Sequence, residues 1–173
     1  MMISLMTFEQ VYSASSVELP GCWLMHVPGV GRGPTAQKRL REVVLAIAKR
    51  HHGGDIVLAE TTTGPRLLGA DWDISFTYDG DDGWIAWSRN GRIGVDAERI
   101  RPIPEAKEIA EEFFAGQRDG YPDADLETAF IRRWTALEAS HKALGTGLGA
   151  CPSTIPLKVS HCLHGDVMVA VAQ

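Results

Sequence analysis

The sequence predicts an α+β domain, in which helices are segregated from antiparallel strands. Two observations support this class. Apolar residues recur at helical spacing in two long stretches, within residues 36–54 and 126–144. Between residues 74 and 98, three short alternating runs (ISFTY, WIAWS and RIGVDAE) are separated by the turn sequences DGDDG and RNG. This arrangement is typical of three successive antiparallel strands.

The first half of the chain is expected to contain two further strands and one helix. CWLMHVPG (residues 22–29) favours a short strand, and DIVLAETTTG (55–64) favours another. Between them, a helix with an apolar stripe should end at Gly53–Gly54. The stripe consists of Leu40, Val43, Val44 and Ile47. Residues 64–72 (GPRLLGADW) suggest a turn-rich connector.

The second half is expected to contain two helices and a closing hairpin. PEAKEIAEEFFAG (104–116) favours a helix, followed by the loop RDGYPDAD and a long helix, LETAFIRRWTALEASHKAL (126–144). The long helix should end at Gly145. The tail (155–173) suggests a hairpin that turns at His164–Gly165–Asp166.

Composition excludes several classes of function. A net charge of -5 argues against general nucleic-acid binding, and no apolar run approaches the length that spans a membrane. Cys22, Cys151 and Cys162 lack the spacing of a metal site or a disulfide framework, and the opening MMISLMTFEQ does not resemble a signal peptide. We therefore expect a cytoplasmic protein with reduced thiols. Residues 32–50 carry six basic residues against one acid, which indicates either a site for an anionic partner or a solvated helix face.

Two acidic residues share one face of the strand RIGVDAE. Side chains alternate along a strand, so Asp96 and Glu98 lie on the same side as Gly94. Like charges this close repel each other unless a cation lies between them, and paired carboxylates hold magnesium beside phosphates in many proteins. The alternative is an exposed strand edge that charge protects from aggregation.

Glu138 and Lys142 lie one turn apart on the long helix. Both stand at the border of an apolar stripe, and the opposite side is rich in alanine; such a helix is covered on two sides. The stripe consists of Phe130, Trp134, Leu137, His141 and Leu144, and the opposite side carries Ala136, Ala139 and Ala143. A Glu–Lys pair contributes only a few tenths of a kcal/mol on an exposed helix. A covered pair therefore suggests a reaction centre, with a partly buried salt bridge as the alternative.

Together these segments resemble the 4′-phosphopantetheinyl transferases. That family is characterised by a (V/I)G(V/I)D segment followed by an acid, and by W-x-x-K-E-x-x-x-K on a helix. IGVDAE and WTALEASHKALGTGL match these motifs in order and separation, and EEFFAGQRDG is similar to the family's intervening "FF" segment. TTTGPRLLGADWDISFT resembles the family's G-x-P-x-L and N-x-S-H-S stretch more weakly.

The resemblance implies transfer of 4′-phosphopantetheine from coenzyme A to a serine of an acyl or peptidyl carrier protein, with release of 3′,5′-ADP. Asp96, Glu98 and Glu138 would hold Mg²⁺ against the pyrophosphate. Lys142 would contact the phosphates and protonate the leaving group, while Glu138 or a water that it orients would accept the serine proton. Lys38, Arg39 and the neighbouring Arg41 would bind the 3′-phosphate. Gly64, Pro65 and Arg66 would lie near the adenine, and Ser75 matches the N-x-S-H-S serine.

Chain length suggests the larger, surfactin-synthetase-activating type of this family. This type implies a monomer with two pseudo-twofold-related α+β halves, here residues 1–91 on the coenzyme A side and 92–173 with the metal-binding motifs, which form one compact unit. Leu137 stands where the family often has lysine, and Phe76 and Thr77 stand where it often has histidine and serine. These departures keep open a non-catalytic homologue that binds coenzyme A or carrier proteins. A trimeric holo-acyl-carrier-protein synthase is a further alternative.

Overall fold

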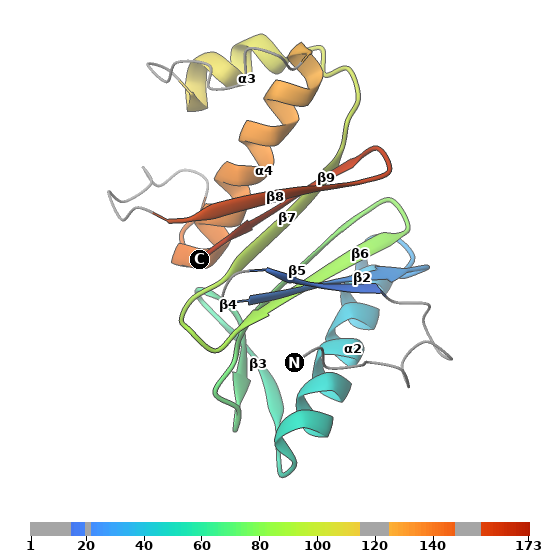
Figure 1. Ribbon diagram of the computed structural model, residues 1–173, viewed down its shortest axis with the longest axis vertical. Coiled ribbons are helices and arrows are strands. Elements are labelled where there is room, and N and C mark those ends of the chain that lie inside the picture. The colour runs from blue at the N-terminus through green and yellow to red at the C-terminus, as the bar shows by residue number, and fades with distance from the viewer. Residues whose placement is uncertain (1–14, 20–21, 115–124, 148–156) are drawn as a thin grey trace.

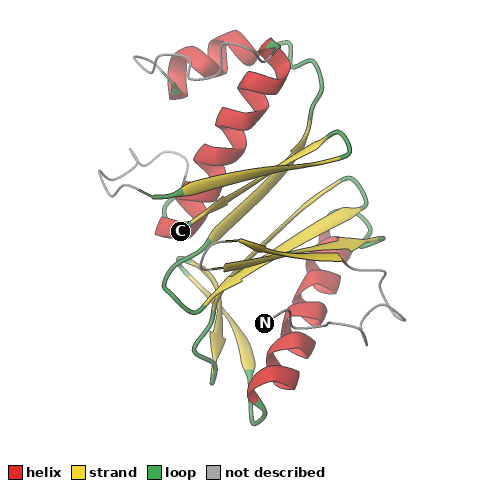
Figure 2. Cartoon of the chain, viewed as in Figure 1, coloured by secondary structure: helices red, strands yellow, loops and turns green. Residues whose placement is uncertain are grey.

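The computed structural model describes residues 15–19, 22–114, 125–147 and 157–173 and confirms the α+β class. Two antiparallel sheets lie next to each other, and each is covered by one long helix on its outer side (Figures 1 and 2). The first sheet has the strand order β1-β2-β6-β5 and the second β7-β9-β8, while β3 and β4 form a separate two-stranded hairpin.

The elements of the first layer are β1 (Ser15–Leu19), β2 (Cys22–Pro28), α2 (Pro34–His52), β3 (Val57–Thr61), β4 (Gly64–Leu68), β5 (Asp73–Asp79) and β6 (Asp82–Ser88). Helix α2 packs on the sheet through its apolar stripe, which is buried as expected. Residues 64–68 form strand β4, so the prediction of a turn-rich connector is wrong over that stretch. The backbone pairing of Val57 with Leu68 and of Thr61 with Gly64 supplies the hydrogen bonds that define the strand.

The second layer consists of β7 (Gly94–Arg99), α3 (Ala106–Phe113), α4 (Leu126–Leu144), β8 (Val159–His164) and β9 (Val167–Ala172). The boundaries of α4 agree with the helix predicted from the sequence for residues 126–144. The Asp125 carboxylate accepts a hydrogen bond from the Thr128 N–H (2.7 Å), and this bond lowers the pKa of Asp125. Gly145, with φ 69°, ends the helix in a left-handed conformation. The closing hairpin turns at Gly165 as expected.

Strand β7 does not continue the sheet of β5 and β6, so the prediction of three successive antiparallel strands is correct only for the β5–β6 hairpin. Instead β7 pairs with β9 over its whole length. The contact of β5 with β7 and the residue before it, which we call the seam, includes side chains of β5 that accept hydrogen bonds from backbone N–H groups. The Ile93 N–H donates to Asp73 Oδ2 (2.8 Å) and the Val95 N–H to Ser75 Oγ (3.0 Å). Each such bond contributes about 1 kcal/mol.

Helix α4 lies unusually close to β7 because the contact consists of small residues. A Cβ atom on Gly94 would lie 1.9 Å from the Ala139 carbonyl oxygen, a distance that no side chain could tolerate. Ala139 and Ala143 are fully buried there against alanines of β9. The opposite side of α4 packs against α3, where Trp134 meets the Phe113 ring edge to face. The helix is therefore covered on two sides, as the sequence predicted.

Cys22 and Cys162 are free thiols within one apolar cluster, and burial raises the pKa of each. Cys151 and the end of the "FF" segment, residues 115–120, lie outside the described residues. In the part of the chain that the structure describes, no helix is long and apolar enough to cross a bilayer.

Candidate functional site

The structure brings together the four charged residues that the sequence singled out on β7 and α4. Asp96 is buried, with 3% of its surface exposed, and Glu98 is half-buried two residues further along the same face. Glu138 and Lys142 project from the adjacent helix and are also half-buried. The close approach of α4 at Gly94 positions both helix side chains next to the strand.

Lys142 is held by three oxygen atoms. Its ammonium lies 2.7 Å from Asp96 Oδ1, and it donates to the Val95 carbonyl (3.1 Å) and the Thr77 hydroxyl (3.3 Å). The lysine side chain is one-third exposed, whereas that of Asp96 is 5% exposed. The Lys142–Asp96 ion pair differs from a solvent-facing bridge between Glu138 and Lys142, because it joins α4 to a buried carboxylate on β7.

The electrostatics show an excess of negative charge at this position. Burial and the charge of Asp96 raise the pKa of Glu138 to about 7, against the opposing effect of Lys142. Burial also raises the pKa of Glu98, opposed by its hydrogen bond from Arg101. The second carboxylate oxygen of Asp96, Oδ2, is buried and has no hydrogen-bond partner among the described residues. Lys142 and Arg101 thus compensate only part of the charge of the three carboxylates.

A divalent cation would suit these residues, although their present positions do not form a coordination sphere. In the described part of the chain, no group of three or more His, Cys, Asp or Glu side chains is arranged to hold a metal ion. The Lys142 ammonium supplies the counter-charge for Asp96. The unpartnered Asp96 Oδ2 and the raised pKa values nevertheless match what a hard, oxygen-binding cation would relieve.

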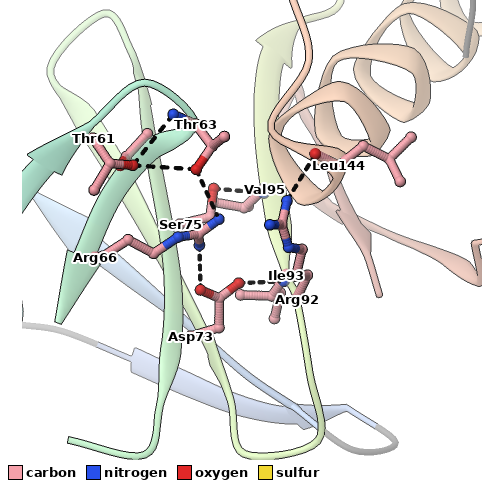
Figure 3. A network of polar contacts seen from close by, with 10 residues as sticks. Thr61, Thr63, Arg66, Asp73, Ser75, Arg92, Ile93, Val95 and Leu144 are labelled. Atoms are coloured by element: carbon pink, nitrogen blue, oxygen red, sulfur yellow. Dashed lines mark hydrogen bonds and ion pairs between the residues drawn. The ribbon is translucent and has the colours of Figure 1, made fainter. Parts of the chain in front are cut away.

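The β3–β4 hairpin is tied to the seam by a polar network (Figure 3). Arg66 forms an ion pair with Asp73, and the other oxygen of Asp73 accepts from the Ile93 N–H. Arg66 also lies 3.5 Å from the hydroxyl of Thr63 at the hairpin turn. A Cβ atom on Gly145 would lie 2.6 Å from Thr63 Cβ, so the hairpin turn meets the end of α4. Arg92 donates to the Leu144 carbonyl there (2.8 Å).

The residues predicted on the coenzyme side fall into two groups. Gly64, Pro65 and Arg66 lie in β4, where Arg66 is part of this network, and Ser75 lies in the seam. Arg66 also lines an open groove of about 410 Å³, together with Arg89 and Arg92.

Lys38 and Arg39 lie elsewhere, on α2. Lys38 lines a different groove of about 510 Å³ between α2 and β3, and none of the β7 and α4 carboxylates lines that groove. Its ammonium is 4.0 Å from Glu42. Arg41 lines the same groove and bonds Glu60 (2.7 Å). Lys38 and Arg41, two of the three residues predicted to bind the 3′-phosphate, therefore line a groove that does not include the carboxylates of β7 and α4.

Asp73 and Thr77 of β5 were not among the site residues predicted from the sequence, whereas Ser75 was. Asp73 and Thr77 contact β7 and the charged group, in addition to Ser75. Their signal is present in DISFTYD, where a polar side chain recurs at every second position from Asp73 to Thr77. The pattern indicates a polar face, but it cannot show which strand that face meets.

The comparisons with known proteins match the segment that holds the charged group. Residues 92–168 match the family model of the 4′-phosphopantetheinyl transferase superfamily. The chain is 34% identical over 88 residues to the Synechocystis sp. protein named "Putative 4′-phosphopantetheinyl transferase slr0495", covering 48% of this chain and 36% of that protein. It is also 34% identical over 61 residues to the 4′-phosphopantetheinyl transferase HetI of Nostoc sp., covering 33% of this chain and 26% of HetI. The matches thus cover about a third or less of these relatives' length.

Proposed function

We propose that this chain, which is similar to the 4′-phosphopantetheinyl transferase superfamily over residues 92–168, is itself such a transferase. It would move the 4′-phosphopantetheine group from coenzyme A to a serine of an acyl or peptidyl carrier protein and release 3′,5′-ADP. The observation that supports this function most directly is the contact of Asp96 with Lys142 and with the titrating Glu138, all within the matched segment.

Mg²⁺ is the cation that we propose for the site, held by the oxygens of Asp96, Glu98 and Glu138. When bound, it would neutralise the charge of the diphosphate and of the leaving phosphate. Asp96 Oδ2 is the oxygen best prepared for this role, because it is buried and has no hydrogen-bond partner among the described residues. Two of the three acids lie on a single strand, which fixes their spacing.

Glu138 and Lys142 would carry out the proton transfers. The new bond joins the serine oxygen to the β-phosphorus of coenzyme A, and the bond from that phosphorus to the 3′,5′-ADP oxygen breaks. Glu138 would accept the serine proton, directly or through a water that it orients. Lys142 is one-third exposed beside Asp96, so its ammonium would contact the phosphates and donate a proton to the leaving oxygen.

The coenzyme would lie against the hairpin and the seam, near Gly64, Pro65, Arg66 and Ser75. We keep Lys38 and Arg39 as the proposed site for its 3′-phosphate, although Lys38 lines the groove between α2 and β3, which is lined by none of the β7 and α4 carboxylates. The larger type with two halves, residues 1–91 and 92–173, is supported by the long helix and the sheet of three or more strands that lie in each half, although the first half also contains the β3–β4 hairpin. A monomer in the cytoplasm completes this proposal.

A non-catalytic coenzyme A- or carrier-protein-binding homologue is the second candidate. Leu137 packs in the apolar cluster between α3 and α4, and Phe76 packs at the edge of the α2 core, 6.0 Å from Arg41. Neither position therefore offers the phosphates a polar group of its own. Binding of coenzyme A without transfer would favour this candidate. A trimer in light scattering would instead favour the holo-acyl-carrier-protein synthase type.

The direct test is loading of a small panel of apo carrier proteins with Mg²⁺ and coenzyme A. The expected result is a mass gain on the carrier serine together with 3′,5′-ADP. Asp96→Asn and Glu138→Gln should each lower the rate about 10²-fold or more. Glu127→Gln, an exposed carboxylate on the same helix, should have no such effect. Unchanged rates in both site variants would refute the assignment, and failure of the wild-type protein to load any carrier would refute the function.

A further inference from the structure

The two oxygens of the Asp96 carboxylate are in different environments. Oδ1 is 2.7 Å from the Lys142 ammonium and accepts from the Thr77 hydroxyl (3.3 Å). Oδ2 is buried and has no hydrogen-bond partner in the described part of the chain. The χ2 torsion of an aspartate has only broad preferences. An aspartate without specific hydrogen-bond partners therefore does not direct one particular oxygen toward a ligand. Here Lys142 and Thr77 both engage Oδ1, and neither of them donates to Oδ2.

Thr77 is the partner whose hydrogen bond has a fixed direction. An ammonium can only donate, so the Thr77 hydroxyl must accept from Lys142 (3.3 Å). Its single proton is then available for Asp96 Oδ1. Thr77 and Asp96 are both buried, with 9% and 3% of their surface exposed, so water competes little for the hydrogen bond between them. The hydroxyl therefore restrains both charged partners at once.

Thr77 reaches this position from the other sheet. It lies on β5, two residues after Ser75, which binds the Val95 N–H and so holds the backbone of β7 directly before Asp96. The matched segment, residues 92–168, includes all three acids and Lys142 but not Thr77. The carboxylates thus depend on a strand outside the segment that carries the family match.

We propose that Thr77 is a positioning residue for the proposed cation site. Its hydroxyl orients the Asp96 carboxylate so that Oδ2 is presented to a divalent cation, and it holds Lys142 against Oδ1. This role rests on the proposed function only in assuming that a divalent cation binds at these carboxylates. Residues that hydrogen-bond a metal-ligating carboxylate typically contribute about 10- to 100-fold to metal affinity.

The test is the affinity for Mn²⁺, followed by the electron paramagnetic resonance signal of the free ion, with and without coenzyme A. Thr77→Val removes the hydroxyl at nearly constant volume and should weaken Mn²⁺ binding about 10-fold. Thr77→Ser keeps the hydroxyl and should stay within about 2-fold of the wild type, by the same reasoning. Thr135→Val is the matched control, because this buried hydroxyl donates to the Ile131 and Arg132 carbonyls of its own helix, away from the carboxylates. Circular dichroism should show that all three variants are folded.

Transfer kinetics give a second measurement with a distinct signature. Thr77→Val should raise the Mg²⁺ concentration at half-maximal rate, while kcat at saturating Mg²⁺ stays close to that of the wild type. Wild-type Mn²⁺ affinity in Thr77→Val, or no Mn²⁺ binding by the wild-type protein, would overturn the proposal even if carrier loading is observed. Weakened binding in Thr77→Val without loading of any carrier would support the positioning role and refute the proposed function.

Discussion

Replacing Glu138 by glutamine should stabilise the metal-free protein at alkaline pH and have little effect near pH 5. The pKa of Glu138 rises from 4.5 to about 7 in the fold. Between these values the folded state keeps a proton that the unfolded chain has released, so the free energy of unfolding falls as pH rises. The penalty is absent below this window and complete above it. Glutamine resembles the protonated acid and removes the penalty.

The expected size of this effect follows from the pKa and the exposure of the side chain. If solvent did not reach Glu138 at all, a pKa rise of this size would lower the free energy of unfolding by about 3 kcal/mol at alkaline pH. Because Glu138 is half-buried, solvent screens the repulsion, and about 1 to 2 kcal/mol is the better expectation at pH 8. For a chain of this length, that corresponds to a Tm higher by about 3 to 6 °C.

The assay is thermal unfolding in the presence of a chelator at pH 5 and pH 8, followed by circular dichroism. Glu112→Gln, an exposed acid on α3, controls for the loss of one negative charge. Adding Mg²⁺ at pH 8 should raise the Tm of the wild-type protein more than that of Glu138→Gln. A Tm difference between Glu138→Gln and wild type that is the same at both pH values would show that Glu138 does not titrate as the fold implies.

Two further substitutions test the packing and the ion pair. Gly94→Ala should lower the Tm by roughly 10 °C, because the new methyl group would overlap the Ala139 carbonyl at a cost of about 3 kcal/mol; Gly147→Ala, where a methyl group meets nothing within 4 Å, is the control, and equal Tm values would contradict the close packing. Lys142→Met should destabilise the metal-free protein by about 2 kcal/mol by leaving the buried Asp96 carboxylate without its cation; Mg²⁺ should recover part of the lost Tm, and an unchanged Tm in chelator would show that the pair contributes nothing.

The sequence predicted the elements with strong local patterns. The limits of α4 followed from its periodicity and from Gly145, and the face shared by Asp96 and Glu98 followed from strand alternation. The alanine-rich side of α4, which includes Ala139, was also recognisable from its helical spacing. These features depend on neighbours in the chain, so the sequence alone specifies them.

Features that depend on distant partners were predicted less well. The alternation in RIGVDAE indicates a strand, but it does not show that β7 pairs with β9 instead of β6. The hairpin strand β4 contains Gly64 and Pro65, which are usually depleted in strands, and only its pairing with β3 overrides that preference. The role of Thr77 could not be foreseen, because its two partners lie 19 and 65 positions away in the chain.

The close approach of Gly94 to Ala139 determines whether the charged side chains of α4 can contact those of β7. Removing side-chain bulk beneath a helix lowers its axis toward the strand, and a lysine ammonium on a flexible four-carbon arm then meets an aspartate that has a single methylene. Bulkier residues at Gly94 or Ala139 would move the helix away from β7, and the short side chain of Asp96 would no longer contact Lys142. Anyone transplanting these charged residues onto another scaffold should therefore copy the glycine and alanine positions first, since they set the depth at which acid and base can meet.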